Sequence, residues 1–186
     1  MDEPTLIRHA VEGDTAAWEA LMRAHQEAVF RLAYLIVGDP DDAEDVAQET
    51  FLRAWKYLKG FDSTRPLRPW LLSIASNLSS NRRRSAGRYF AALTRAFRDE
   101  PAPATVEEKS SEQSKANELW KAVQKLNMQD QQIVYLRYFL DLPIAEAALA
   151  LQVAEGTVKS RLSRALDKLR NIIKQDFPIL NEGHEA

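Results

Sequence analysis

The sequence has no cysteine, few glycines and no long apolar run, and each shortage excludes a class of protein. Without cysteine, the chain has no disulfide, no thiolate metal site and no cysteine nucleophile. No segment approaches the roughly 18 consecutive apolar residues of a membrane-spanning helix. Asp2 and Glu3 do not begin a basic segment followed by an apolar one, as in a secretion signal. We therefore expect a cytoplasmic protein with no membrane association.

Scarce glycine and abundant Ala, Leu, Arg, Glu and Gln favour helix almost throughout, so the composition predicts an all-α protein. Pro101 and Pro103, followed by acidic residues and serines, interrupt the apolar periodicity and indicate a polar linker. We predict two small helical domains joined by a flexible linker. The N-terminal domain covers residues 5–88, the linker 89–116 and the C-terminal domain 117–174.

Positive and negative charges alternate in blocks along the chain, although the net charge is only -2. Residues 1–64 hold 13 acidic and 6 basic residues, whereas residues 65–98 hold eight arginines and no acid. A second basic block, residues 155–174, has 6 basic and 2 acidic residues and follows an acidic stretch. Two separate cationic blocks suit a protein that contacts phosphate at two places.

In the N-terminal domain, apolar residues recur at three- and four-residue steps from Trp18 to Ala33 and predict a helix. Gly38-Asp39-Pro40 ends that helix, and Asp39 or Asp41 can cap the next one. The first turn of this next helix is acidic, which complements the positive helix end. A further helix is predicted after Pro66 and Pro69.

In the C-terminal domain, a short helix after Pro143 and a long helix after Gln152-Val153-Ala154 predict a helix-turn-helix. The apolar side of the long helix leaves a basic and hydroxyl-bearing side that suits the DNA major groove. That side carries Thr157, Lys159, Ser160, Arg161, Ser163, Arg164 and Lys168. Taken alone, the same pattern also describes an amphipathic helix with a solvated basic face.

Two segments resemble one known family. Residues 155–165, Glu-Gly-Thr-Val-Lys-Ser-Arg-Leu-Ser-Arg-Ala, resemble the DNA-binding region of the extracytoplasmic-function (group 4) family of bacterial sigma-70-type sigma factors. Residues 38–55, from Gly-Asp-Pro-Asp-Asp-Ala-Glu-Asp to Leu-Arg-Ala-Trp, are similar to that family's second region. The similarity continues through Arg68-Pro69-Trp70-Leu71 and Asn77-Leu78. Both motif sets occur in the family's order and cover most of the chain.

The resemblance implies a subunit that directs RNA polymerase to promoters and is not an enzyme. One helix of the first domain would dock on the clamp helices of the largest polymerase subunit, through Asp42, Asp45, Gln48, Glu49, Leu52, Arg53 and Lys56. The alternative for this helix is a solvated face with ordinary pairs such as Glu49 with Arg53.

The arginine block would then hold the melted minus-10 element, because arginines bind a single-stranded backbone and a flipped base needs a pocket with polar edges. The residues implied are Arg65, Arg68, Trp70, Asn77, Asn81, Arg82, Arg83 and Arg84. Trp70 is either a stacking platform or, at this helical spacing, a core residue. Arg82, Arg83 and Arg84 also suit an ordinary helix end.

The second domain would hold the minus-35 element as duplex and contact the flap of the second-largest polymerase subunit. The family also implies an anti-sigma factor as partner, and no metal or other cofactor. Ala154 stands where the family usually has Ser at the cap of the recognition helix. Such a loss typically costs about 0.5–2 kcal/mol, so the start of that helix is expected to be less firmly fixed.

Two other classes of protein fit parts of the sequence. A stand-alone helix-turn-helix regulator would bind duplex DNA without polymerase, but it would leave the acidic helix and the arginine block unexplained. A metal-dependent enzyme would use Asp41, Asp42, Asp45 and Glu49, although acids at a helix start more often complement the helix dipole.

Overall fold

The computed structural model describes residues 2–96 and 111–180, and within these ranges it contains helices and no strand. Before the gap lie α1 (Glu3–Val11), α2 (Thr15–Val37), α3 (Pro40–Tyr57), the short turn η1 (Leu58–Gly60) and α4 (Leu67–Ala96). After the gap lie α5 (Ser111–Gln124), α6 (Met128–Val134), η2 (Tyr135–Phe139), α7 (Ile144–Leu151), α8 (Glu155–Asp176) and η3 (Pro178–Leu180). The all-α prediction is confirmed.

Side-chain caps fix the helix boundaries of the N-terminal half. Asp14 accepts hydrogen bonds from two backbone N–H groups at the start of α2. Gly38 ends α2 with φ of 81°, a left-handed conformation that glycine adopts without strain. Asp39 then caps α3 by accepting from the N–H of Asp42 at 2.9 Å, so of the two predicted caps, Asp39 and Asp41, it is Asp39 that acts.

Glu3 ties three helices of the N-terminal half together. One of its carboxylate oxygens accepts the N–H of Leu67, the first residue of α4, at 3.1 Å. The other oxygen lies 3.0 Å from Nε2 of His25, which is buried on α2. This contact holds the start of α4 against α1 and α2, a pairing across 64 residues that periodicity does not reveal.

An aromatic cluster and a helix-turn-helix organise the C-terminal half. Trp120 of α5 stacks on Tyr135 at 5.7 Å between ring centroids, and Phe139 meets both rings edge-on. Burial raises the pKa of the Tyr135 phenol to about 12. Between α7 and α8, Gln152 adopts φ of 56°, which turns the chain sharply into α8.

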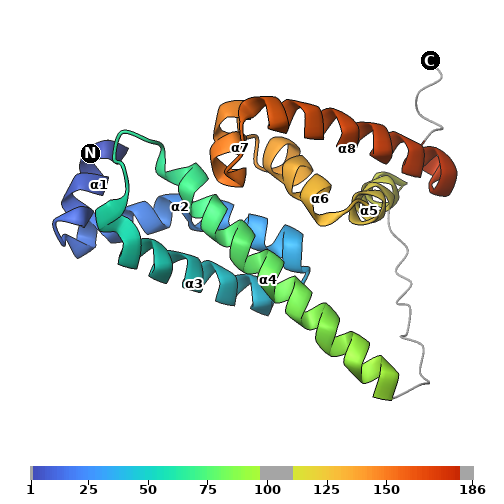
Figure 1. Cartoon of the computed structure of the whole chain (residues 1–186), viewed down its shortest axis with the longest axis horizontal. Helices are drawn as coiled ribbons and strands as arrows, with labels where there is room; N and C mark the ends of the chain where they lie inside the picture. The colour runs from blue at the N-terminus through green and yellow to red at the C-terminus, as the bar shows by residue number, and fades with distance from the viewer. Residues whose placement is uncertain (1, 97–110, 181–186) are drawn as a thin grey trace.

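The two halves pack directly against each other, with α7 lying on α4 (Figure 1). One continuous cluster of buried apolar side chains includes Leu71 and Leu72 of α4 together with Ala147 and Ala150 of α7. α4 continues through residues 89–96 and α5 begins at Ser111, so both helices extend into the range predicted as linker. Pro101 and Pro103 lie outside the described residues.

Candidate nucleic-acid and partner interfaces

Most residues predicted to dock on polymerase lie on the solvent side of α3. Asp45, Gln48, Leu52, Arg53 and Lys56 are exposed. The Leu52 side chain is the most exposed large apolar one in the part of the chain described, at 67%. Arg53 also donates to Glu49 at 2.6 Å, the i,i+4 pair that the sequence suggested. An apolar side chain left in water among charges is typical of a protein interface.

Beside this face, α2 and α3 form an apolar groove of ≈ 960 Å³. Its acidic and amide edge is formed by Glu19, Gln26, Glu27, Glu44 and Gln48, and its apolar lining includes Trp18, Met22, Phe30, Phe51, Leu52 and Trp55. The sequence analysis missed the α2 side of this groove. Phe30 follows Val29 directly and so lies off the apolar stripe of α2. The sequence signal for this wall of the groove was Phe30, a large aromatic residue placed off the apolar stripe.

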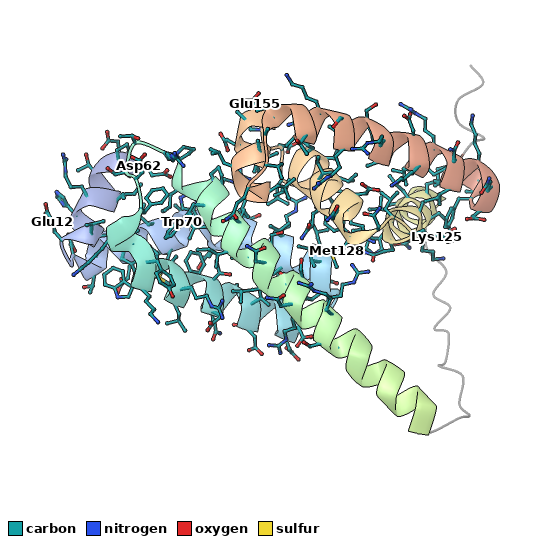
Figure 2. The ribbon with its side chains drawn as sticks, viewed as in Figure 1. Glu12, Asp62, Trp70, Lys125, Met128 and Glu155 are labelled. Carbon is teal, nitrogen blue, oxygen red and sulfur yellow. The ribbon has the colours of Figure 1, made fainter. Side chains whose placement is uncertain are left out.

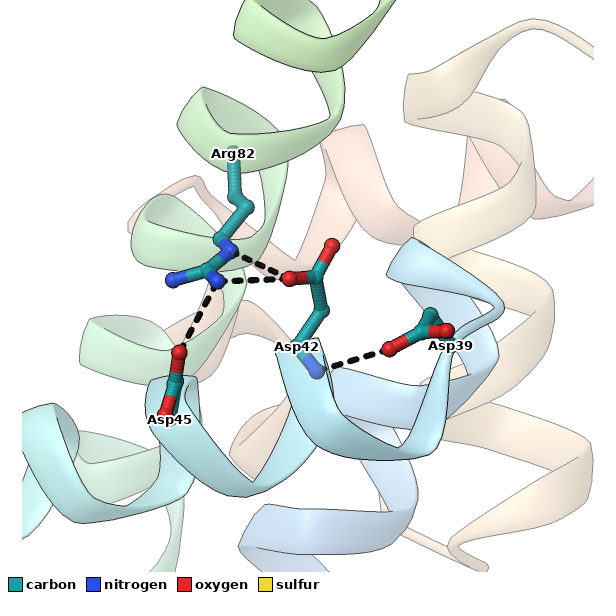
Figure 3. A network of polar contacts seen from close by, with 4 residues as sticks. All are labelled: Asp39, Asp42, Asp45 and Arg82. Carbon is teal, nitrogen blue, oxygen red and sulfur yellow. Dashed lines mark hydrogen bonds and ion pairs between the residues drawn. The ribbon is translucent and has the colours of Figure 1, made fainter.

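Arg82 of α4 pairs with two acids of α3 (Figure 3). Its guanidinium donates to Asp42 at 2.5 and 2.8 Å and to Asp45 at 2.9 Å. The Asp42 hydrogen bond is the largest cause of a raised pKa for Arg82, and Asp45 adds to it. The sequence assigned Arg82 to DNA and the two acids to polymerase, but the structure joins them to each other.

Two other arginines of α4 reach the C-terminal half. Arg68 donates to the carbonyl of Leu140 at 2.9 Å, and Arg83 donates to Oε1 of Gln131 at 2.7 Å. Arg84 stays on the exposed side and donates to Asn81 at 2.7 Å. The predicted arginine cluster is therefore distributed over three environments, facing α3, the C-terminal half and solvent.

A pocket of ≈ 690 Å³ opens where η1 leads into α4. Phe61, Asp62, Arg65 and Trp70 line it, and the labels of Figure 2 place Asp62 and Trp70 at this end of the molecule. Trp70 is half-buried and packs on Phe61 at 4.7 Å between centroids, so it joins the edge of the core while facing the pocket. Aromatic walls with a nearby guanidinium suit an unstacked base.

Asp62 stabilises the loop that carries this pocket. Its carboxylate accepts from the hydroxyl of Thr64 at 2.6 Å and from the Thr64 N–H at 3.0 Å. These hydrogen bonds lower the pKa of Asp62, because they favour the charged carboxylate. The sequence analysis assigned neither Phe61 nor Asp62 to DNA.

The basic side of α8 is largely exposed. Lys159, Ser160, Ser163 and Arg164 lie in solvent, and Thr157 and Arg161 are half-buried. Lys168 is exposed as well, and its ammonium pairs at 2.6 Å with Asp130, whose side chain is only 7% exposed. All seven predicted residues are thus at least partly exposed, and Lys168 also links α8 to α6.

Ala154 occupies the N-cap of α8 and gives the helix no side-chain hydrogen bond. Only its carbonyl contributes, by accepting the N–H groups of Thr157 and Val158. The first turn of the basic helix therefore has backbone donors without a capping oxygen.

Within residues 2–96 and 111–180, no three His, Asp or Glu side chains are grouped so that they could hold a metal ion. Arg82 pairs with Asp42 and Asp45, two of the four acids that the enzyme alternative needed. In the same ranges, no helix is long and apolar enough to cross a membrane.

Comparison with known proteins gives matches over both halves. The model for Sigma-70 region 2 matches residues 21–89, and the model for Sigma-70, region 4 matches residues 116–169. The ECF RNA polymerase sigma factor SigL of Mycobacterium tuberculosis is 35% identical over 179 residues, which covers 89% of this chain and 96% of SigL.

Two solved structures share the fold. CnrH, in complex with the cytosolic domain of CnrY, has a TM-score of 0.71 at 24% identity over 94% of this chain and 98% of CnrH. The sigma factor RpoE from Bartonella quintana, in complex with the anti-sigma factor NepR, has a TM-score of 0.64 at 25% identity. This second match covers 85% of this chain and 97% of RpoE.

Proposed function

Because the chain belongs to the extracytoplasmic-function branch of the sigma-70 family and acts as an RNA polymerase sigma factor, we propose a specific division of work between its two halves. The N-terminal half docks on the clamp helices of the largest polymerase subunit and captures the melted minus-10 strand. The C-terminal half binds the minus-35 duplex through α8 and contacts the flap of the second-largest subunit. The observation that carries this proposal is that one chain of net charge -2 combines the apolar groove between α2 and α3 with two basic blocks in its sequence.

Polymerase docking is supported by the groove between α2 and α3. A helix pair can bury Leu52, Trp55 and Phe30 there, while Gln48 and the acids at the edge fix its register by polar contacts. Asp42 and Asp45 act indirectly, because their pairing with Arg82 fixes α3 against α4.

Capture of a melted strand is supported by the pocket beside η1. Trp70 and Phe61 provide aromatic faces, and Arg65 provides a cation at the same opening. Unstacking a base costs a few kcal/mol, and base–aromatic stacking contributes about 1–3 kcal/mol per base. Promoter opening without ATP is then feasible when such contacts offset unstacking.

Duplex binding is supported by the exposed face of α8. Arg164 and Lys159 extend from a helix that follows a sharp turn, as in helix-turn-helix proteins. Each half is expected to bind DNA weakly on its own, and tethering both to polymerase raises the effective concentration of the second contact.

We also propose an anti-sigma factor as a partner. The similar RpoE was solved in complex with the anti-sigma factor NepR. An exposed apolar groove on the polymerase-docking side is a suitable target for a competing partner, since one occupant excludes the other.

Reconstituted transcription on fragmented genomic DNA tests the proposal. Core RNA polymerase with the purified chain is expected to start transcripts at new positions that share two spaced upstream elements, and core polymerase alone is not. The proposal is wrong if the chain neither copurifies with core polymerase nor changes where transcripts start. Gel-shift binding to duplex DNA with no gain from core polymerase would instead support the stand-alone regulator.

A further inference from the structure

Glu3 of α1 connects a buried histidine to the first turn of α4. One of its carboxylate oxygens accepts the N–H of Leu67 at 3.1 Å, and the other lies 3.0 Å from Nε2 of His25. A carboxylate only accepts hydrogen bonds, so Nε2 of His25 is the donor in this pair. The His25 side chain is 9% exposed and the Glu3 side chain 38%, so the contact lies at the edge of the core. His25 therefore orients the carboxylate that binds α4.

The N–H of Leu67 needs an acceptor from outside α4. The first N–H groups of an α-helix have no partner within the helix, and a negative charge near this end is favourable. α4 begins directly after Pro66, and the Leu67 side chain is fully buried in the apolar core. The first turn of α4 is thus held at two points, by the side chain of Leu67 in the core and by its N–H on Glu3.

The pocket beside η1 has walls on both sides of Leu67. Arg65 precedes Leu67 by two residues and Trp70 follows it by three, and both line the pocket. These are the cation and one of the aromatic faces proposed to hold an unstacked base. A shift in the first turn of α4 would move both of them, so the shape of the pocket depends on the contact between Glu3 and Leu67.

The other hydrogen bonds of this loop are local. Asp62 accepts from the hydroxyl and the N–H of Thr64, and its carbonyl accepts the N–H of Arg65 at 3.0 Å. These bonds lie within residues 62–65, so they shape the loop without setting where it stands against α1 and α2. The contact of Glu3 with Leu67 spans 64 positions and sets that placement.

We infer that Glu3 is a positioning residue for capture of the melted minus-10 strand, because its carboxylate, itself held by His25, keeps Arg65 and Trp70 where they admit an unstacked base. The inference rests on the proposed function, since it requires that this pocket takes such a base. Glu3 is outside the lining of the pocket and acts through the backbone of Leu67.

Three substitutions of Glu3 separate the length of its side chain from its charge. Glu3→Ala removes both acceptor oxygens. Glu3→Asp keeps the charge, but its side chain is one methylene too short to reach both partners. Glu3→Gln keeps the length and an oxygen for the N–H of Leu67. The matched control is Glu12→Ala, at an exposed glutamate at the other end of α1.

A double-mutant cycle between chain and promoter tests the inference. Holoenzyme is assembled from core RNA polymerase and each full-length variant, and heparin-resistant open complexes are measured on a promoter mapped by transcription. Each base of the minus-10 element on the non-template strand is removed in turn to leave an abasic site. With the unchanged chain, one abasic position is expected to lower open-complex formation by about tenfold, because the stacking of one base is lost.

On the intact promoter, Glu3→Ala should lower open-complex formation by about tenfold, and the same abasic site should then lower it by less than about twofold more. Glu3→Asp should behave like Glu3→Ala and supplies the same comparison if the alanine variant does not fold. Glu3→Gln should recover to within about threefold of the unchanged chain, and Glu12→Ala should match it.

A second cycle shows that the effect is confined to the pocket. Arg164→Glu, on α8, should lower transcription by the same factor with Glu3 and with Glu3→Ala, because distant and independent sites add. A chain that is only less stable would lose activity by the same further factor at the abasic site as well.

Equal abasic effects in Glu3→Ala and in the unchanged chain would overturn the positioning role. Glu3→Ala within about twofold of the unchanged chain on the intact promoter would overturn it too. Failure of the proposed function looks different. In that case the unchanged chain forms no open complexes, or forms open complexes that no abasic site weakens.

Discussion

At the scale of single residues, the pKa of Tyr135 shows the effect of burying a phenol. Its side chain is 0% exposed and its hydroxyl accepts a hydrogen bond from Gln124 at 3.1 Å. The apolar surroundings disfavour the phenolate and raise the pKa of the group from 10.0 to about 12. The folded chain therefore retains this proton at a pH where the unfolded chain has lost it.

The first prediction concerns stability at high pH. The contribution of Tyr135 is fully present below pH 10.0 and is lost as the pH rises through about 12. Between pH 8 and pH 11.5, the free energy of unfolding of the unchanged chain should fall by about 2 kcal/mol more than that of Tyr135→Phe. Urea unfolding of both proteins measures this difference. An equal loss in the two proteins would show that the phenol ionises normally.

The second prediction concerns the uncapped start of α8. Ala154→Ser or Ala154→Asn should add a side-chain acceptor for the first-turn N–H groups and stabilise the chain by about 0.5–2 kcal/mol. Thermal unfolding and amide exchange at residues 155–158 measure the gain. Ala154→Val, which offers no acceptor, is the matched control. A gain as large in the valine variant would exclude capping as its cause.

The sequence predicted the contacts of single residues only where the two partners lie near each other along the chain. The cap at Asp39 and the Glu49–Arg53 pair are local, and the structure contains both. Arg82 finds its acids 37 and 40 residues away, and no periodic pattern encodes such a distance. The sequence did not decide whether Trp70 is a core residue or a stacking platform. In the structure Trp70 is half-buried, packs on Phe61 and also lines the pocket beside η1.

At the scale of elements, the proposal assigns different partners to α3 and α8. Each helix buries an apolar stripe and exposes a polar one, so the periodicity of apolar residues in the sequence predicted both helices. Periodicity did not reveal the groove, since its second wall belongs to α2 and depends on the packing angle of two helices.

The third prediction tests α3. Leu52→Asp should weaken binding to core polymerase by at least about tenfold, because it places a charge in an interface that needs apolar contact. Affinity is measured by titrating labelled chain with core polymerase. Leu52→Met should bind nearly normally, and Ile179→Asp, at a 50% exposed apolar residue beyond α8, should have little effect. Equal loss in both aspartate variants would indicate a nonspecific cause.

The fourth prediction tests the outer face of α8. Arg164→Glu should reduce transcription from a promoter with a minus-35 element by about 10- to 100-fold, the effect of losing a base or phosphate contact. Arg170→Glu is the matched control, since Arg170 is exposed on the same helix but outside the predicted face. Run-off transcription compares the two variants. Similar losses would mean that net charge, and not this face, determines activity.

At the scale of the whole molecule, the sequence did not predict that the two halves pack against each other. The sequence predicted two helical units, residues 5–88 and 117–174, and the two family models match residues 21–89 and 116–169. Contacts such as Gln132 with Ser80 join residues 52 positions apart and use ordinary polar side chains. No composition or motif marks such residues as an interface.

The left-handed backbone at Gln152 has a consequence for which residues this turn tolerates. A glycine would relieve the conformation, which costs a residue with a side chain on the order of 1 kcal/mol. Glutamine nevertheless stands there, and its side chain lines both pockets between the halves. Gln152→Gly should therefore make the turn easier to form while it removes a side chain from both pockets. The strained backbone of Gln152 is therefore retained together with a side chain that lies where the two halves meet.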